Sequence, residues 1–296
     1  EVLVVSASAF LDELKRGGLA AQAKVVRSRR KWTTVALLSA MGIVAVVVPL
    51  YLWGIPGLSS LVAARIPPSW EERLGQGLLD ELAPTEKICA GDPSNETLQE
   101  ILDRLTSSLG QTGYNFRIVV VMNPAVNAYA VPGGTIVLFS GLLKKTANPE
   151  QLAGVLAHEV QHITKRHGTR AMLQHMSMGL IVSALSGDTR ALRSAQVIGM
   201  MRYSRQYERE ADEEAMKLLL VSRINRKGMV AFFESLAKQY EKSAKVPAYL
   251  STHPDLEERV QNLKALAATR SSYPLPLLPG CDWKKVQSFC QASDSP

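Results

Sequence analysis

Histidine and cysteine are scarce in this chain, which contains five histidines and three cysteines among its 296 residues. Cys89, Cys281 and Cys290 do not stand at metal-ligand spacing with a partner histidine, so a cysteine-based zinc site is not expected. The sequence also lacks a phosphate-binding loop, a zinc ribbon and a stripe of interleaved basic and aromatic residues. These absences argue against a nucleic-acid-binding protein.

Charged residues make up 21% of the chain, and none of them lies between Thr33 and Leu58. A helix over these 26 positions would be roughly 39 Å long, more than the ~30 Å hydrocarbon core of a bilayer requires. The segment therefore predicts a transmembrane helix over residues 32–58, with Tyr51 and Trp53 suited to a membrane interface. A buried core helix is the alternative. A cleavable signal peptide is not expected, because the apolar run is too long and lies well inside the chain.

Positive charge is concentrated before this span, where residues 1–31 carry seven lysines and arginines against three acidic residues. The flank after the span has Arg65 and then the acidic pair Glu71 and Glu72. We expect a single-pass protein of a bacterial inner membrane. The positive-inside rule predicts that residues 1–31 lie in the cytoplasm and the rest in the periplasm or outside the cell. Because much of the net charge of +7 serves this topology, it does not indicate nucleic-acid binding. The chain opens without methionine, so we expect the cytoplasmic part to be longer in the complete protein.

The segment HEVQH, residues 158–162, places two of the five histidines four positions apart. On an α-helix, His158 and His162 project from the same face, so both imidazoles can bind one ion. Zinc held by two histidines and one further protein ligand keeps an open position for water, whose pKa it lowers towards ~7. Glu159 could then accept the proton of that water. The alternative is a buried helix that carries two hydrogen-bonded core histidines.

Local signals indicate that this segment is helical. Asn148, Pro149 and Gln151 are typical of an N-cap, a first helical turn and a capping box. Gly168 follows a basic stretch and is typical of a helix end. The HEVQH segment is therefore expected inside a helix that ends before Gly168.

A third metal ligand is expected from the acidic stretch at residues 204–220. In a helix, Glu208 and Asp212 share a face with small and apolar residues. Burial of an unpaired carboxylate is costly, so these two side chains need a metal, a cation or a hydrogen-bond donor. We expect Glu208 to bind the metal and Asp212 to accept a hydrogen bond from a ligand histidine, whereas the alternative is an ion pair with Arg205 or Arg259. The acidic residues on the opposite, solvent-facing side are Glu210, Glu213 and Glu214.

Three separated motifs resemble those of the HtpX-like and CAAX-prenyl-protease-like zinc metallopeptidases, which are gluzincins. They are HEVQH at 158–162, SRQYEREAD at 204–212 and STHPDLEER at 251–259. The resemblance extends from about residue 70 to about residue 265. Because the three motifs occur in the right order, the resemblance is specific.

The resemblance implies one zinc ion per chain, held by His158, His162 and Glu208. Glu208 is the first residue of an ExxxD motif whose last residue, Asp212, is implied to support a ligand. Glu159 is implied to be the general base. The family pattern and the helical periodicity thus select the same two carboxylates, Glu208 and Asp212.

Strand signals precede the HEVQH segment. Two β-branched runs, Phe116–Met122 and Thr135–Phe139, predict strands, and residues 132–134 predict the turn of a hairpin. The resemblance places this edge beside the zinc cleft, where a polypeptide substrate could add its backbone as an extra strand. Asn127 and Ala128 are the candidate substrate-binding residues. The alternative is a plain core sheet.

His253 precedes Pro254, a proline that suits the first turn of a short helix. The resemblance places His253 near the zinc, where it could stabilise an oxyanion or occupy the open position of the metal in a resting state. As a lone histidine in a loop, it could instead be a cap or a surface residue. His167 and His175 receive no predicted role.

The expected fold is α+β, a zincin-like metallopeptidase domain with helices around a small β-sheet, preceded by the transmembrane helix. We expect a Pro- and Gly-rich linker at 59–75, the metallopeptidase domain at 76–270, and a proline-extended tail at 271–296. The apolar run 172–185 is too short to cross a membrane and is expected to be a core or lid helix, broken at 187–195. Further helices are expected at 95–110 and 255–267.

The three cysteines would all lie on the oxidising side of the membrane, which permits one disulfide and leaves one thiol. A pair of Cys89 and Cys290 would join the start of the domain to its tail. A pair of Cys281 and Cys290 would close a small local loop. The sequence does not choose between them.

Together these features predict a membrane-anchored zinc endopeptidase. The resemblance implies extended or misfolded polypeptides as substrates and cell-envelope quality control as the setting. Two other classes stay open: an inactive zinc-bound scaffold that recruits partners, and a structural membrane protein with buried histidines.

Overall fold

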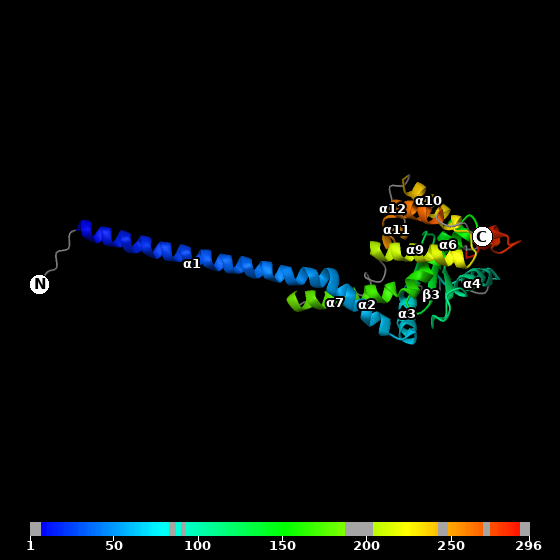
Figure 1. Ribbon diagram of the computed structural model, residues 1–296, viewed down its shortest axis with the longest axis horizontal. Coiled ribbons are helices and arrows are strands. Elements are labelled where there is room, and N and C mark those ends of the chain that lie inside the picture. Colours follow the sequence, from blue (N-terminus) through cyan, green and yellow to red (C-terminus); the bar gives the residue numbers. More distant parts are fainter. Residues whose placement is uncertain are drawn as a thin grey trace, which may run out of the picture. The chain divides into compact units, whose positions relative to one another are not determined.

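The computed structural model (Figure 1) describes residues 7–82, 87–89, 93–186, 204–241, 248–268 and 273–290. The chain divides into two compact units, Glu1–Gly57 and Leu58–Pro296.

The described part of the first unit is helical. Helix α1 covers Ala7–Pro49 and a short π-helix, η1, covers Leu50–Gly54. Helix α2, Ile55–Arg65, continues the helical residues into the second unit. Among the described residues, Trp32–Arg65 form the helical stretch that is long and apolar enough to cross a membrane. This stretch extends seven residues beyond the predicted span of 32–58, because α2 remains helical and apolar.

The second unit consists of helices around a three-stranded sheet, which confirms the predicted α+β class. The strands are β1 Arg117–Val121, β2 Ala128–Val131 and β3 Thr135–Phe139. The helices are α3 Pro68–Leu82, α4 Pro93–Thr106, α5 Ser140–Lys145, α6 Pro149–Thr164, α7 His167–Ser186, α9 Arg205–Val221, α10 Lys227–Glu241, α11 Ala248–Thr252, α12 Leu256–Ala268 and α13 Trp283–Gln287.

The sheet has the strand order β1-β3-β2, with β1 parallel and β2 antiparallel to β3. The predicted hairpin is therefore present between β2 and β3. Its turn contains Gly133 at φ +91°, and a Cβ at this position would lie 2.4 Å from the Cα of Glu72. Only glycine allows both this backbone angle and the close approach of α3 to the hairpin. In the described part of the chain β2 pairs with β3 alone, so its other side is an edge of the sheet.

Helix α6 lies at the centre of the second unit and is buried from Gln151 to Ile163. It begins as predicted: the Asn148 side chain accepts a hydrogen bond from the Gln151 N–H at 3.0 Å, and the Gln151 side chain accepts one from the Ala147 N–H at 2.8 Å. Helices α9 and α10 pack against it. Gly154 allows α10 to approach closely, since a Cβ there would lie 2.6 Å from the Cα of Met229. The surrounding helices thus fix α6 in position on more than one side.

Helix α6 ends before Gly168, as predicted, but Gly168 is not its stop signal. Helix α6 ends at Thr164, Arg166 adopts a left-handed backbone with φ 56°, and Gly168 lies in the first turn of α7. The Arg166 side chain donates hydrogen bonds to the carbonyls of Ala63 and Ile66. The corner between α6 and α7 is therefore fastened to the end of α2, a long-range contact that no local pattern shows.

The expected linker at 59–75 is helical in the structure. It contains the end of α2 and the first half of α3, and the second compact unit begins at Leu58 rather than at residue 76. Pro68 is the first residue of α3, a position at which the missing N–H of proline breaks no helical hydrogen bond. The prolines of this segment therefore start a helix instead of preventing one.

The expected C-terminal tail is also partly folded onto the domain. Helix α13 lies within it, and Trp283, Val286 and Phe289 belong to the main core. The indole N–H of Trp283 donates to the carbonyl of Thr146 at 3.0 Å. Of the two disulfides that the sequence left open, the structure forms Cys89–Cys290, with its Cα atoms 5.6 Å apart.

Two further predictions concern the region after α6. The apolar run 172–185 lies within α7, as a helix was predicted there. The break predicted at 187–195 lies outside the described residues.

Candidate metal centre

Helix α6 carries the first three site residues, His158, Glu159 and His162, and all three are buried. The spacing of four residues turns both imidazoles to one side of the helix, and their Nε2 atoms lie 3.0 Å apart. The two rings are inclined by 77° to each other. This arrangement allows the lone pairs of both Nε2 atoms to reach one ion.

Helix α9 brings the third donor. Its N-cap Ser204 accepts a hydrogen bond from the Tyr207 N–H, which begins the helix one turn before Glu208. The Glu208 carboxylate lies 3.4 Å from His158 Nε2 through one oxygen and 3.4 Å from His162 Nε2 through the other. Glu208 and Asp212 are both buried, as the helical periodicity predicted.

His253 lies between α11 and α12 and is fully buried, so it is neither a surface residue nor a loose cap. Its Nδ1 is 3.3 Å from His158 Nε2 and 3.0 Å from a carboxylate oxygen of Glu208. The ring stacks on Tyr249 with centroids 4.4 Å apart. His253 therefore contributes a fourth donor to the same cluster.

The four donors fit a zinc ion. Ligand atoms at ~2.0–2.1 Å from a tetrahedral zinc lie roughly 3.3 Å from one another. The measured separations between donor atoms of His158, His162, Glu208 and His253 include 3.0, 3.3 and 3.4 Å, and all lie within 4.8 Å. Three imidazoles and one carboxylate are also a donor set that zinc prefers.

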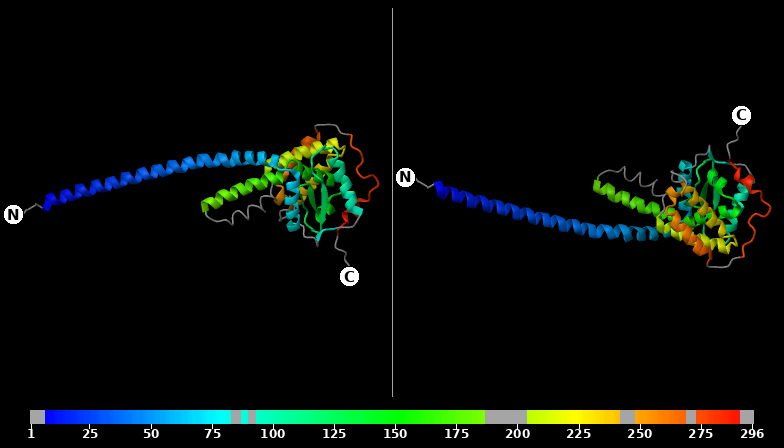
Figure 2. Two further views of the ribbon diagram at one scale, coloured as in Figure 1. Left: turned by 90° about the horizontal axis from the view of Figure 1, so that it is seen from below. Right: turned by 90° about the horizontal axis from the view of Figure 1, so that it is seen from above.

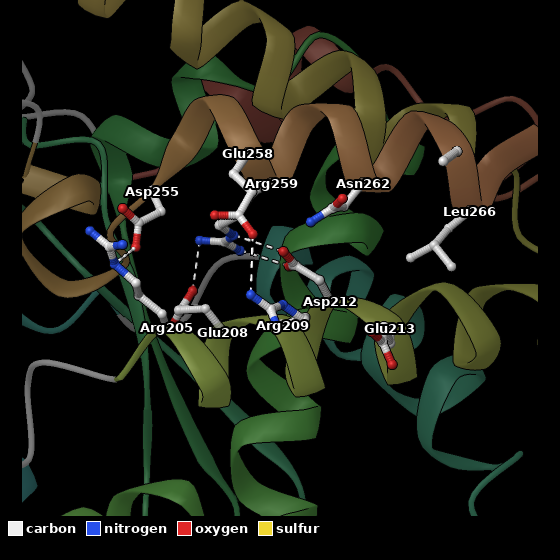
Figure 3. A pocket seen from close by; sticks show the side chains of 11 residues that line it. Arg205, Glu208, Arg209, Asp212, Glu213, Asp255, Glu258, Arg259, Asn262 and Leu266 are labelled. Atoms are coloured by element: carbon white, nitrogen blue, oxygen red, sulfur yellow. Dashed lines mark hydrogen bonds and ion pairs between the residues drawn. The ribbon is translucent and has the colours of Figure 1, made fainter.

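The Asp212 carboxylate lies 2.9 Å from His158 Nδ1, where it can orient this imidazole towards a metal. The alternative prediction, an arginine ion pair, also holds. Arg259 donates to both oxygens of Asp212 at 2.7 Å, and its Nη1 lies 2.6 Å from Glu208 (Figure 3). The buried guanidinium of Arg259 thus balances part of the negative charge of Glu208 and Asp212 beside the donor cluster.

The second histidine of the cluster, His162, has a partner that was not predicted from the sequence. The Nδ1 of His162 lies 3.0 Å from Nδ1 of the buried His167, and His167 Nε2 lies 3.1 Å from the Glu210 carboxylate. His167 received no predicted role, and Glu210 was placed on the solvent-facing side of α9. In the structure, Glu210 is half-buried between α9 and the start of α7, where Arg170 lies 3.6 Å away. Each α6 histidine therefore has a partner for its Nδ1 atom, which fixes the ring orientation.

The pKa values of two carboxylates of the site, Glu159 and Glu208, are shifted in opposite directions. Burial raises the pKa of Glu159, although the neighbouring His253 and His158 act against this change. Burial would also raise the pKa of Glu208, but the positive charges of His253, Arg259 and His158 hold it well below its usual range. Glu208 is thus kept as an anion suited to metal binding, while Glu159 becomes a better proton acceptor.

The imidazoles of His158 and His162 also differ. Burial lowers the pKa of His162 to about 3, so its ring is neutral and can offer a lone pair. Burial and Arg259 act in the same direction on His158, but the carboxylates of Glu208 and Asp212 outweigh them and raise its pKa to about 9. A metal that binds His158 must therefore displace a proton.

The side of β2 that faces away from β3 lies beside Glu159. The carbonyl of Asn127 accepts a hydrogen bond from the Phe139 N–H, so antiparallel alternation directs the main-chain groups of Ala128 and Ala130 away from β3. The Ala130 backbone stabilises the anion of Glu159. The predicted substrate residues have other partners: the Asn127 side chain accepts from the Ala128 N–H at 3.0 Å and from the Thr252 hydroxyl at 3.4 Å. Asn127 thus connects β2 to the segment that carries His253, and the Ala130 backbone is hydrogen-bonded to Glu159.

A pocket of about 340 Å³ lies behind the carboxylates, with walls from α9 and from residues 255–266 (Figure 3). Two ion pairs cross its rim, Arg205 with Asp255 at 2.7 Å and Arg209 with Glu258 at 3.2 Å. The pocket reaches Glu208 from the side of α12. It is therefore separate from the edge of β2, where Ala130 and Glu159 meet.

Comparison with known proteins gives a matching family. The sequence profile described as Peptidase family M48 matches residues 93–267, more than half of the chain. This range contains every donor of the cluster.

Individual relatives are proteases by name, and two of the three described below are named as metalloproteases or metalloendopeptidases. The chain is 28% identical to the beta-barrel assembly-enhancing protease of Escherichia coli, over 71% of this chain and 46% of that protein. It is 29% identical to the Escherichia coli metalloprotease YcaL, over 70% of this chain and 84% of that protein. It is 25% identical to the mitochondrial metalloendopeptidase OMA1 of Schizosaccharomyces pombe, over 58% of this chain and 52% of that protein. The chain spans about half the length of the beta-barrel assembly-enhancing proteases that it matches.

Proposed function

Because this chain belongs to peptidase family M48, we propose that it is a zinc-dependent endopeptidase that hydrolyses peptide bonds of extended or misfolded polypeptides. The observation that carries the proposal is the buried cluster of His158, His162, Glu208 and His253 beside Glu159. Zinc bound to these donors lowers the pKa of water towards ~7 and polarises a carbonyl group.

In this proposal Glu159 is the general base. It accepts a proton from the water that attacks the scissile carbonyl and later donates it to the leaving amine. Burial raises the pKa of Glu159, which makes its carboxylate a better proton acceptor. The side of β2 that faces away from β3 holds the substrate backbone as an added strand, so that main-chain hydrogen bonds give affinity with little side-chain selectivity.

His253 has a different role in this proposal. Its Nδ1 lies beside the donor atoms of His158 and Glu208, where it would hold the position that water takes in catalytic zinc sites with three protein ligands. Its Nε2 lies 3.6 Å from a carboxylate oxygen of Glu159. We infer that this conformation is a resting one and that His253 leaves this position during turnover.

The function is tested with the purified full chain. We expect about one zinc per chain and cleavage of casein that stops on treatment with 1,10-phenanthroline and returns when stoichiometric zinc is added. Zinc binding without cleavage would support the inactive scaffold instead. A chain without zinc would support the structural membrane protein.

We further propose that the chain is anchored in a bacterial inner membrane through Trp32–Arg65, with the protease unit on the periplasmic side. The length and apolar composition of this helical stretch and the seven cationic residues before it support the proposal. The name of the Escherichia coli relative, a beta-barrel assembly-enhancing protease, fits a role in envelope quality control.

The orientation gives a separate prediction. A reporter enzyme that works only outside the cytoplasm, fused after Pro296, is expected to be active, because the cationic flank of residues 15–31 is retained in the cytoplasm. A cytoplasm-specific reporter at the same place is expected to be inactive. The reverse pattern would contradict the orientation.

A further inference from the structure

An apolar groove of about 520 Å³ opens at the start of the second unit, away from the donor cluster. Leu58, Leu61 and Val62 of α2 form one wall, Trp70 of α3 forms another, and Leu173 of α7 closes it. The side chains of Leu58 and Leu61 are 63% and 65% exposed. A contiguous exposed apolar surface of this kind marks a binding surface.

The length of the apolar helix indicates what covers this surface. Trp32–Arg65 comprise 34 helical residues, which at ~1.5 Å per residue extend over roughly 51 Å. The hydrocarbon core is ~30 Å thick and needs ~20 residues. About 14 residues of the stretch are therefore left over, more than the usual tilt of ~20° can absorb.

Leu58, Leu61 and Val62 lie at the end of this stretch that joins the protease unit. They are exposed and not packed into the core. In water their apolar surface would be hydrated, which is unfavourable compared with burial in an apolar environment. Two neighbours suit the boundary between lipid and water: Trp70 is an amphipathic aromatic residue, and Arg65 can extend its guanidinium to phosphate groups. The groove thus combines an apolar floor with the side chains of a membrane interface.

Helix α7 adds to the same surface. Leu173 lies in the groove, and the sequence from Ala171 to Ser186 contains no Asp, Glu, Lys or Arg. Figure 2 shows α7 projecting from the body of the protease unit in both views. This uncharged part is roughly 24 Å long, too short to cross a bilayer but long enough to lie in its interface.

We propose that the end of α2, Trp70 and the start of α7 form a membrane-docking surface whose groove takes up phospholipid acyl chains. This inference rests on the proposed membrane anchoring and adds that the protease unit itself, and not only its anchor, is inserted in the leaflet. Such docking holds the catalytic unit at a fixed height, so that its cleft meets polypeptides that emerge near the membrane.

The four tryptophans of the chain provide the test. Trp32 and Trp53 lie in the candidate span, Trp70 lies in the groove, and Trp283 lies in the core of the protease unit. The full chain is reconstituted in phosphatidylcholine vesicles with or without bromine atoms on the acyl chains near the headgroup, since bromine quenches a tryptophan that it touches. The emission of each residue is the difference between wild type and its Trp→Phe variant.

We expect the emission lost in Trp70→Phe to be reduced in brominated vesicles to less than about half of its value in unbrominated ones, since Trp70 contacts acyl chains at the interface. Equal emission in both vesicles would overturn the docking surface. It would also be the outcome if a second copy or another protein covered the groove.

Two controls separate this inference from the anchoring on which it rests. If Trp53 is quenched and Trp70 is not, the span is in the bilayer and the docking surface alone fails. If neither is quenched, the anchoring itself fails. A variant with Trp32, Trp53 and Trp70 all changed to Phe keeps Trp283 alone, and its emission should be equal in both vesicles because Trp283 is buried against Thr146.

Discussion

Replacing Glu159 by glutamine is expected to leave zinc bound and to slow peptide hydrolysis by ~10²-fold or more. Glutamine has nearly the same shape, but its amide cannot accept the proton of the attacking water. Glu159 is not among the four clustered donors, so zinc affinity should not depend on its charge. The measurement is zinc content per chain together with the rate of casein cleavage.

A matched control lies on the same helix. Glu150 is in the first turn of α6, nine residues before Glu159 and therefore ~13 Å away along the axis. Glu150→Gln should change neither zinc content nor rate. If the Glu159→Gln variant cleaved casein at the wild-type rate, another group would have to accept the proton.

Replacing Glu208 by glutamine is expected to weaken zinc binding by more than the ~10–100-fold that is typical of changes around a ligand. A neutral amide is a poor substitute for a carboxylate ligand. The change also removes the anion that pairs with Arg259 Nη1 at 2.6 Å, so Asp212 alone would balance this positive charge beside the ion. Zinc affinity is measured by competition with a chelator, and activity should fall in parallel with zinc content.

Two other variants define what is specific to Glu208. Glu213→Gln changes an exposed carboxylate on the same helix and should leave zinc affinity unchanged. His253→Ala removes a donor but leaves His158, His162 and Glu208, so zinc should stay bound, and turnover should rise if His253 holds a resting state. Loss of zinc from Glu213→Gln with retention in Glu208→Gln would reverse the assignment of the inward face of α9.

The sequence predicted those parts of the site that lie on a single helix. The spacing of His158 and His162 fixes a common direction, because the helical repeat sets side-chain directions without reference to the rest of the fold. The same reasoning selected Glu208 and Asp212 on α9, and both are buried in the donor region. The capping box at Asn148 was also readable, since its hydrogen bonds join residues three or four positions apart.

Helical periodicity was less reliable for Glu210. It correctly places Glu210 on another side of α9 than Glu208, but it does not show which element covers that side. Helix α7 turns back against it because Arg166 takes a left-handed backbone, and His167 then lies between Glu210 and His162. The support of His162 therefore depends on a corner of the fold, and the HxxxxH spacing from His162 to His167 was its one trace in the sequence.

The sequence by itself determined the residue types of the donors and their directions on each helix. It also determined two strands, the turn at residues 132–134 and the long uncharged stretch. Only the tertiary structure decided that His253 is the fourth donor, that Arg259 pairs with both carboxylates, and that Cys89 rather than Cys281 bonds to Cys290. The physical reason is distance along the chain. Hydrogen bonds within a helix or a turn follow from neighbouring residues, whereas contacts between residues ~50 to 200 positions apart depend on how the helices pack, which no local pattern encodes.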